Sequence, residues 1–278
     1  EGGPSNIQAV GEEKALAELD AAGGAAFEAA GLPYAPVAVA VLGLAGIDLD
    51  GADVIRAWAE RVELGGRVSV ANDATLLFAA GTPEGWGLAV VAGTGSIAFT
   101  IDRDGKQGRT GGWGYLLGDE GSAFRLGMLA LRAACRSADH IGPETKLLPA
   151  LLAKLGSDCP RDFIPAVYRG AWDKAAIAGF APVVLDLVDS DEVARGIFEE
   201  QVRELARTAA GAVANAGLDP EDVPVALTGG LVLRSELYRD RFLTELRACG
   251  VTPGHVGLVD EPVAGAVVLA RKTFNQMV

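Results

Sequence analysis

Histidine and cysteine are both scarce in this 278-residue chain. The two histidines, His140 and His255, lie far apart and form no H-E-x-x-H pattern, so we expect neither a histidine metal cluster nor a histidine-dependent triad. The three cysteines, Cys135, Cys159 and Cys249, are odd in number and lack C-x-x-C spacing. We therefore expect small buried thiols, no disulfide framework and a cytoplasmic protein.

Long apolar runs and basic stretches are also missing. No apolar run approaches the roughly 20 residues of a membrane span, and the sequence shows no signal-peptide pattern. The formal net charge is −13, which opposes sequence-independent binding to nucleic acid or anionic lipid. We expect neither nucleic acid nor a membrane as a partner.

Hydrophobic residues are plentiful, at 50% of the chain, enough for the core of one large domain or two small ones. Their periodicity gives a βα rhythm. Helices are predicted at 11–31, 50–63, 74–81 and 261–274, and strands at 37–46 and 67–71. Two extended runs lie within 85–102, and a βα unit is predicted at 223–246. The stretch from 120 to about 215 is predicted to be mostly helical, with prolines breaking it into segments. This order predicts an α/β fold with a mainly parallel core and a helical insertion or second lobe.

The segment Gly93-Thr-Gly-Ser-Ile-Ala98 fits the G-x-G-x-x-(G/A) pattern of a dinucleotide-binding turn. A Rossmann turn, however, leads directly into a helix whose N-terminus holds the pyrophosphate. Here Ile97, Phe99 and Ile101 alternate with smaller or polar residues, which is the period of a strand. The segment is therefore predicted to be a hairpin turn, either an ordinary one or one that holds phosphate through its glycines and hydroxyls.

Four short motifs follow one another along the chain: Asn-Asp at 72–73, AGTGS at 92–96, GGWGYLLGDEGS at 111–122 and TGG at 228–230. Together they resemble the N-acetylglucosamine kinase and BadF/BadG/BcrA/BcrD ATPase family, within the actin, hexokinase and Hsp70-like ATPases. The resemblance runs from Asn6 to the C-terminal helix, and GGWG followed by GDEGS is its most specific element. It implies an α/β, two-lobed actin-like ATPase (ribonuclease H-like) fold that binds ATP, Mg²⁺ and a sugar in the cleft between its lobes.

The resemblance assigns Asp73 as the catalytic base. Asp73 ends a predicted strand and opens a helix, a position from which a carboxylate can accept a proton from a sugar hydroxyl. The alternative is a helix N-cap, and the two roles are compatible.

The sugar-binding segment matches Gly112, Trp113, Gly114 and Asp119. A carboxylate accepts bonds from hydroxyls, and an indole gives flat apolar contact, so these residue types suit a sugar. A core tryptophan beside a surface turn is the alternative. Asn6 aligns with a family asparagine that bonds the sugar, unless it only forms a turn.

The nucleotide site is implied at two glycine turns. Gly93, Thr94, Gly95 and Ser96 match a phosphate loop. Gly229 and Gly230 match a turn against adenosine, where the lack of side chains makes room for base and ribose; an ordinary strand-to-helix turn is the alternative. No residue of this chain is assigned to the metal.

Two departures from the family pattern limit the resemblance. Some sugar kinases of the family carry asparagine after GTGS, where this chain has Ile97. The acceptor is therefore expected to be N-acetylglucosamine or glucosamine, with another hexose as the alternative. Family members also open with a β-hairpin that carries a phosphate loop, and nothing in residues 1–40 matches it. We therefore hypothesise that the N-terminal hairpin is missing from this sequence.

These observations lead to one functional hypothesis and two rivals. The hypothesis is a cytoplasmic, homodimeric amino-sugar kinase that phosphorylates the 6-hydroxyl of N-acetylglucosamine or glucosamine. Its N-terminal lobe is expected at 1–86, completed by 261–278, and its C-terminal lobe at 87–260. The rivals are a BadF-type ATPase, disfavoured because the cysteines do not suit an iron–sulfur cluster, and a non-catalytic sugar-binding relative.

Overall fold

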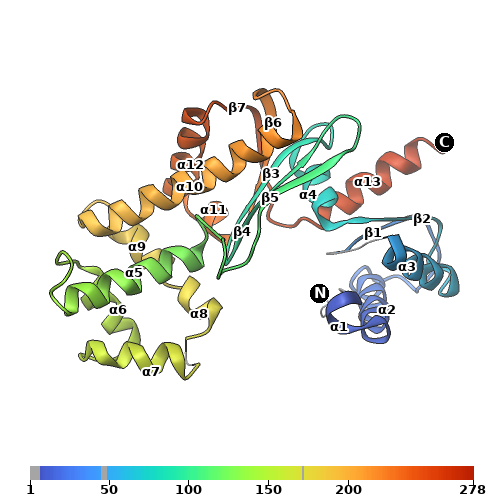
Figure 1. Ribbon diagram of the computed structural model, residues 1–278. Coiled ribbons are helices and arrows are strands. Elements are labelled where there is room, and N and C mark those ends of the chain that lie inside the picture. The colour runs from blue at the N-terminus through green and yellow to red at the C-terminus, as the bar shows by residue number, and fades with distance from the viewer. Residues whose placement is uncertain (1–6, 45–48, 171) are drawn as a thin grey trace. The chain divides into compact units, whose positions relative to one another are not determined.

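The structure is a computed structural model that describes residues 7–44, 49–170 and 172–278 (Figure 1). The chain forms two compact units. The first consists of Glu1–Gly85 with Glu261–Val278, and the second is continuous from Trp86 to Asp260.

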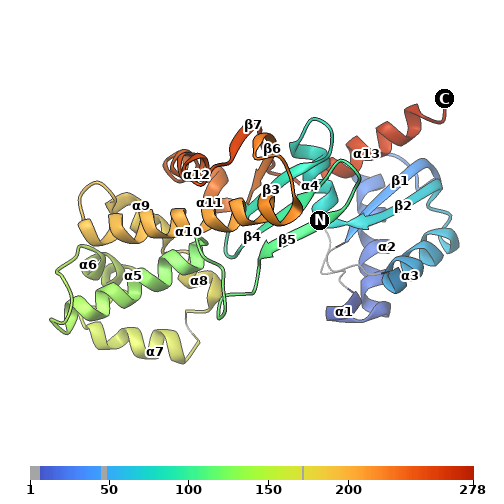
Figure 2. The ribbon, with the colours of Figure 1, turned by 45° about the horizontal axis from the view of Figure 1, so that its top comes forward.

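The first unit is built on two parallel strands, β1 (Val37–Leu44) and β2 (Gly65–Asn72). Figure 2 shows the helix of residues 49–61 on one side of these strands and the C-terminal helix on the other, where it packs against the helix that follows β2. The helices are α1 (Ile7–Val10), α2 (Glu12–Ala29), α3 (Leu49–Arg61), α4 (Asp73–Gly81) and α13 (Ala264–Asn275). Trp58 of α3 is buried, and its indole N–H donates to Asp20 of α2 at 2.9 Å.

The C-terminal helix returns to the first unit through a close contact with α4. A side chain on Gly265 would collide with the backbone carbonyl of Leu76. Glycine is therefore needed where α13 crosses α4, and this crossing joins sequence segments almost 200 residues apart.

The second unit holds a five-stranded sheet in the order β5-β4-β3-β6-β7. Its strands are β3 (Gly87–Ala92), β4 (Ser96–Ile101), β5 (Gln107–Gly111), β6 (Glu221–Thr228) and β7 (Thr252–Leu258). The β3–β4–β5 part is antiparallel, whereas β6 and β7 run parallel to β3. The sheet is thus mixed rather than mainly parallel, because β3, β4 and β5 are joined by short hairpins that can only give antiparallel pairs.

Helices make up the rest of the second unit. They are α5 (Ala123–Ala138), α6 (Leu147–Leu155), α7 (Phe163–Tyr168), α8 (Lys174–Ala178), α9 (Ala181–Leu187), α10 (Glu192–Ala216), α11 (Gly230–Arg234) and α12 (Glu236–Ala248), with a 3₁₀ turn at Pro160–Asp162. The long helix α10 lies along the sheet next to α12 (Figure 2). Leu205 and Val202 of α10 are fully buried in the same core as Leu88 and Val90 of β3.

Asp191 fixes the start of α10 against the start of α6. Its carboxylate accepts hydrogen bonds from the amides of Ala194 (2.8 Å) and Lys146 (2.7 Å) and from the hydroxyl of Thr145 (3.0 Å). Burial alone raises the pKa of a carboxyl group, but these hydrogen bonds outweigh burial and hold the pKa of Asp191 below its ordinary value.

Several local predictions were wrong in detail. Pro149, Pro165 and Pro182 lie inside α6, α7 and α9 rather than between helices. Each occupies the first turn, where an amide is not required by the helix. Strand β7 was not predicted, and its sequence TPGHVGL explains why: proline and two glycines disfavour a strand, and only pairing with β6 imposes one.

Candidate active site

The two predicted glycine turns lie against each other in the second unit. They follow β3 and β6, which pair in parallel with Val91 opposite Thr228, so both turns emerge at the same edge of the sheet. Gly229 has φ +102°, and a Cβ there would lie 2.5 Å from the carbonyl oxygen of Ala92. A Cβ on Gly93 would lie 3.6 Å from the Cα of Gly229. Gly229 therefore cannot gain a side chain without movement of the first turn.

The first turn joins β3 and β4 as a hairpin, as its alternating pattern predicted. Its carbonyls are held by helix α5, since the amide of Ala123 donates to Gly93 (2.9 Å) and that of Phe124 to Thr94 (3.3 Å). The amide of Gly93 donates to the carbonyl of Gly95 at 3.0 Å. Because the amide of Gly93 already donates this hydrogen bond, it is not free to bind a phosphate.

Ser96 is also engaged within the protein. Its buried hydroxyl donates to the carbonyl of Glu120 at 2.7 Å. Thr94, by contrast, is exposed. Of the two hydroxyls predicted to face a phosphate, Thr94 is the one that can turn to a ligand in this structure.

A pocket of about 700 Å³ opens beside these turns, within the second unit. Gly93, Thr94 and Gly230 line one part of it. Its other walls, which no sequence motif predicted, combine small or apolar residues with polar and charged ones. The small or apolar ones are Ala123, Ala175, Ala178, Gly179, Ala181, Pro182, Leu185, Leu231 and Leu237, and the polar or charged ones are Asp186, Arg234, Ser235 and Glu236. These residues are scattered over several helices and share no motif. A chamber with an apolar wall, a few polar groups and glycine turns at one side is suited to a flat base linked to phosphates.

The GDEGS segment places Asp119 next to the first turn. Asp119 is 4% exposed and has φ +64°. Its Oδ1 accepts a long hydrogen bond from the amide of Ser96 (3.4 Å), and its Oδ2 lies 3.1 Å from the ammonium of Lys174. A Cβ on Gly95 would lie 2.9 Å from the same Oδ2. The predicted sugar-binding carboxylate and the predicted phosphate loop are thus in contact.

Side chains from α10 and α12 hold the turn after Asp119 through two hydrogen bonds. The amide of Gly121 donates to the side-chain oxygen of Gln201 (3.0 Å), and the carbonyl of Gly121 accepts from the buried hydroxyl of Tyr238 (2.5 Å). Burial raises the pKa of Tyr238 far above its ordinary value, so this hydroxyl remains a donor. These two hydrogen bonds hold the backbone that carries Asp119.

The GGWG segment presents an exposed tryptophan. Trp113 is 67% exposed, with the guanidinium carbon of Arg109 5.7 Å from its ring centroid. The alternative of a core tryptophan is therefore wrong. Gly112 has φ +68°, and a side chain there would collide with Ile97. Ile97 thus fills apolar space beside Gly112, in the position where some family members carry asparagine.

Asp73 belongs to the first unit. It is the first residue of α4 and is exposed. Asn72 holds the N-cap position and accepts the amide of Ala74 at 3.0 Å, and the carboxylate of Asp73 accepts the same amide at 2.9 Å. Asp73 is therefore the first helical residue rather than the N-cap, but it shares the capping hydrogen bond with Asn72. Asn6 lies outside the described residues.

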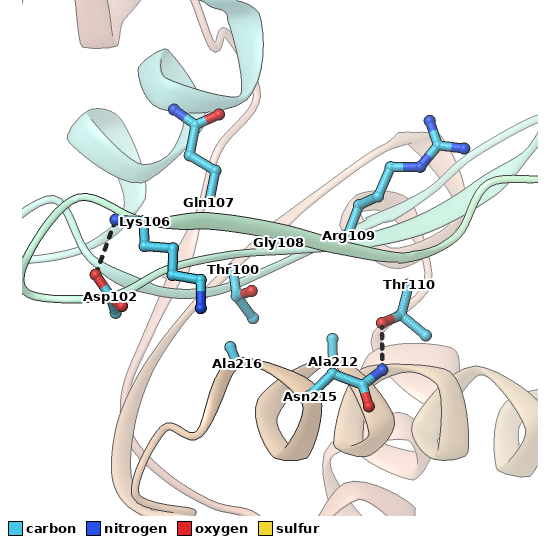
Figure 3. A pocket seen from close by; sticks show the side chains of 10 residues that line it. All are labelled: Thr100, Asp102, Lys106, Gln107, Gly108, Arg109, Thr110, Ala212, Asn215 and Ala216. Carbon is cyan, nitrogen blue, oxygen red and sulfur yellow. Dashed lines mark hydrogen bonds between the residues drawn. The ribbon is translucent and has the colours of Figure 1, made fainter.

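A second hollow, of about 80 Å³, lies between the β4–β5 hairpin and the C-terminal part of α10 (Figure 3). Lys106 and Thr110 point towards α10, where Asn215 donates to the hydroxyl of Thr110 at 3.4 Å, and Arg109 points away. None of the predicted site residues lines this hollow. The larger pocket is therefore the candidate site.

Membrane spans, metal clusters and disulfides do not occur in the parts of the chain that the structure describes. No helix there is long and apolar enough to cross a membrane, and no three His, Cys, Asp or Glu side chains there gather as metal ligands. The three cysteines are free, but Cys135 and Cys159 are exposed rather than buried.

Comparisons with known proteins identify relatives of the chain. The model of the BadF/BadG/BcrA/BcrD ATPase family matches residues 1–270. An N-acetylmuramic acid/N-acetylglucosamine kinase of Clostridium acetobutylicum is 31% identical over 207 residues, which cover 74% of this chain and 68% of the relative. An N-acetyl-D-glucosamine kinase of Dictyostelium discoideum is 29% identical over 238 residues, which cover 82% of this chain and 74% of the relative.

The fold of this chain is also similar to that of a solved structure. It is that of a candidate N-acetylglucosamine kinase from Chromobacterium violaceum, with a TM-score of 0.68 and 29% sequence identity, covering 97% of this chain and 88% of that one.

Proposed function

This chain belongs to the BadF/BadG/BcrA/BcrD ATPase family and has the actin-like ATPase fold, and on that basis we propose that it is an ATP-dependent amino-sugar kinase. The acceptor is N-acetylglucosamine or glucosamine, and the phosphate goes to the 6-hydroxyl. The relatives named as kinases of such sugars support this proposal.

The observation that carries the proposal is the contact between Asp119 and the Gly93–Ser96 turn. A kinase must bring an acceptor hydroxyl and a terminal phosphate together, since phosphoryl transfer depends mainly on positioning and charge stabilisation. Asp119 lies against Gly95, and the same turn borders the pocket of about 700 Å³. One turn therefore separates a hydroxyl-binding carboxylate from a chamber large enough for a nucleotide.

Each part of the reaction falls to a different group. Thr94 and the glycine turns receive the phosphates, and the apolar wall formed by α8, α9 and α11 receives the base. Asp119, Trp113, Gly112 and Gly114 receive the sugar, together with Asn6. Asp73 orients the acceptor hydroxyl and accepts its proton.

Magnesium enters this proposal as part of the substrate. Mg²⁺ in kinases keeps several waters and is held by one or two carboxylates together with the substrate phosphates. We propose that the ion arrives as MgATP, with the phosphates and water among its ligands.

The test is ADP release from MgATP in the presence of N-acetylglucosamine, glucosamine, N-acetylmuramic acid, glucose or no sugar. The proposal expects release that depends on an amino sugar. Equal release with and without sugar would instead indicate an ATPase. Sugar binding measured by calorimetry without any ADP release would indicate a non-catalytic relative.

A further inference from the structure

Lys174 is a charged side chain beside Asp119 to which the proposed function gives no role. Lys174, the first residue of α8, places its ammonium 3.1 Å from Oδ2 of Asp119. The two side chains differ in accessibility, at 38% exposed for Lys174 and 5% for Asp119. A buried carboxylate is unfavourable unless it is paired, and Lys174 supplies the opposite charge.

The pair is placed at the junction of the two predicted subsites. Oδ2 of Asp119, which contacts Lys174, is also the oxygen nearest to Gly95 in the phosphate turn. The next residue of α8, Ala175, lines the pocket of about 700 Å³. The ammonium of Lys174 also lies 5.4 Å from the ring centroid of Tyr115, in the loop between GGWG and GDEGS. A sugar bound at Asp119 must therefore lie close to the lysine.

The acidic side chains next to the pair in sequence have partners of their own. Glu120 is paired with Arg125 at 3.8 Å. Asp173 is exposed, and its carboxylate caps α8 through the amide of Ala176 at 2.8 Å. Arg109, beside Trp113, adds a positive charge.

We propose that Lys174 is a specificity-determining residue that neutralises the charge of Asp119 and so favours neutral, N-acylated amino sugars over cationic free amino sugars. This inference rests on the proposed function and names its substrate class. With Lys174 in place, Asp119 has no net charge to offer a second ammonium, and a cationic sugar meets the repulsion of the lysine. Without it, Asp119 attracts a cation. The selection does not require contact between Lys174 and one particular atom of the sugar.

The experiment compares kcat/KM for N-acetylglucosamine and for glucosamine in the wild type and in three variants. Lys174→Met removes the charge and keeps most of the stem, Lys174→Arg keeps the charge, and Lys154→Met is a matched control on the exposed end of α6. Near pH 6 the amine of glucosamine is protonated, because its pKa resembles the value of about 8 for an α-amino group. We expect Lys174→Met to shift the ratio about tenfold towards glucosamine and the other two variants to leave it unchanged.

Two further conditions separate charge selection from structural damage. At about pH 9, where glucosamine is mostly neutral, the shift caused by Lys174→Met should disappear. It should also shrink in 1 M salt, where the screening length falls to about 3 Å. An unchanged ratio for Lys174→Met at pH 6, or an equal shift at both pH values, would overturn the inference. If the wild type releases no sugar-dependent ADP, the proposed function itself fails, which is a different outcome.

Discussion

Gly229 and Gly230 are adjacent glycines, yet the structure predicts that replacement by alanine lowers the free energy of unfolding strongly at Gly229 and changes it little at Gly230. Gly229 has φ +102° and ψ 145°, a region that is essentially restricted to glycine. A Cβ there would lie 2.5 Å from the carbonyl oxygen of Ala92, the last residue of the central strand β3. For Gly230 no positive φ occurs, and the nearest atom to a Cβ is Nε of Arg234 at 4.0 Å, the end of a flexible side chain.

The magnitude follows from two terms. Backbone strain in a glycine-only region costs about 1–3 kcal/mol, and forcing an extra methyl group into a packed site costs about 1–3 kcal/mol. Gly229→Ala should therefore lower the free energy of unfolding of the second unit by roughly 2–6 kcal/mol, which for a domain of this size lowers Tm by on the order of 10 °C. Gly230→Ala should change the free energy by less than about 1 kcal/mol.

The assay is urea unfolding of the full chain followed by tryptophan fluorescence. Trp86, Trp113 and Trp172 belong to the second unit, whereas Trp58 is in the first, so the signal reports mainly on the unit that carries both glycines. Equal stability of the two variants would refute the reasoning, because it would mean that the turn after β6 can relax away from Ala92. The sequence TGG alone gives no reason to expect any difference.

Three other perturbations have defined outcomes. Asp73→Asn should reduce kcat by about 10²–10⁴ while the Kd for sugar, measured by calorimetry, changes little; retained turnover would end its assignment as base. Tyr238→Phe leaves the carbonyl of Gly121 without its donor and should destabilise the chain by about 1–3 kcal/mol. Since the raised pKa keeps Tyr238 protonated in the folded state, the wild type should also lose stability as pH rises above about 10, and the variant should lose less; parallel alkaline curves would contradict this. Asp191→Ala should cost about 2 kcal/mol at pH 7. Because the folded pKa of Asp191 is lowered, its contribution is present above about pH 4 and is lost as pH falls further, so wild type and variant should converge in urea titrations at low pH.

Much of the local structure could be predicted from the sequence because local rules decide it. The alternation of Ile97, Phe99 and Ile101 correctly indicated a strand after the glycines, which excluded a Rossmann turn. The alanine-rich stretch near the N-terminus correctly indicated α2. Strand β7 could not be predicted, since its residues form a strand only when paired with β6.

Some residues of the candidate site could likewise be predicted from the sequence, and others could not. Glycines, hydroxyls and carboxylates stand in short motifs along the chain, and the resemblance of these motifs to a known family selected Gly93, Asp119 and Gly229. The walls of the pocket and Lys174 could not be selected in this way, because an isolated alanine or lysine carries no signal of its own.

The sequence by itself determined the composition of both cores, the helices and strands with clear periodicity, and the motifs that resemble a kinase family. Only the tertiary structure decided that the turn after β3 contacts both the turn after β6 and Asp119, and that Lys174 balances that carboxylate. The physical reason is the distance along the chain over which each kind of interaction acts. Periodicity and turn chemistry act over a few neighbouring residues, whereas parallel strand pairing and the burial of a charge join residues that are distant in the chain.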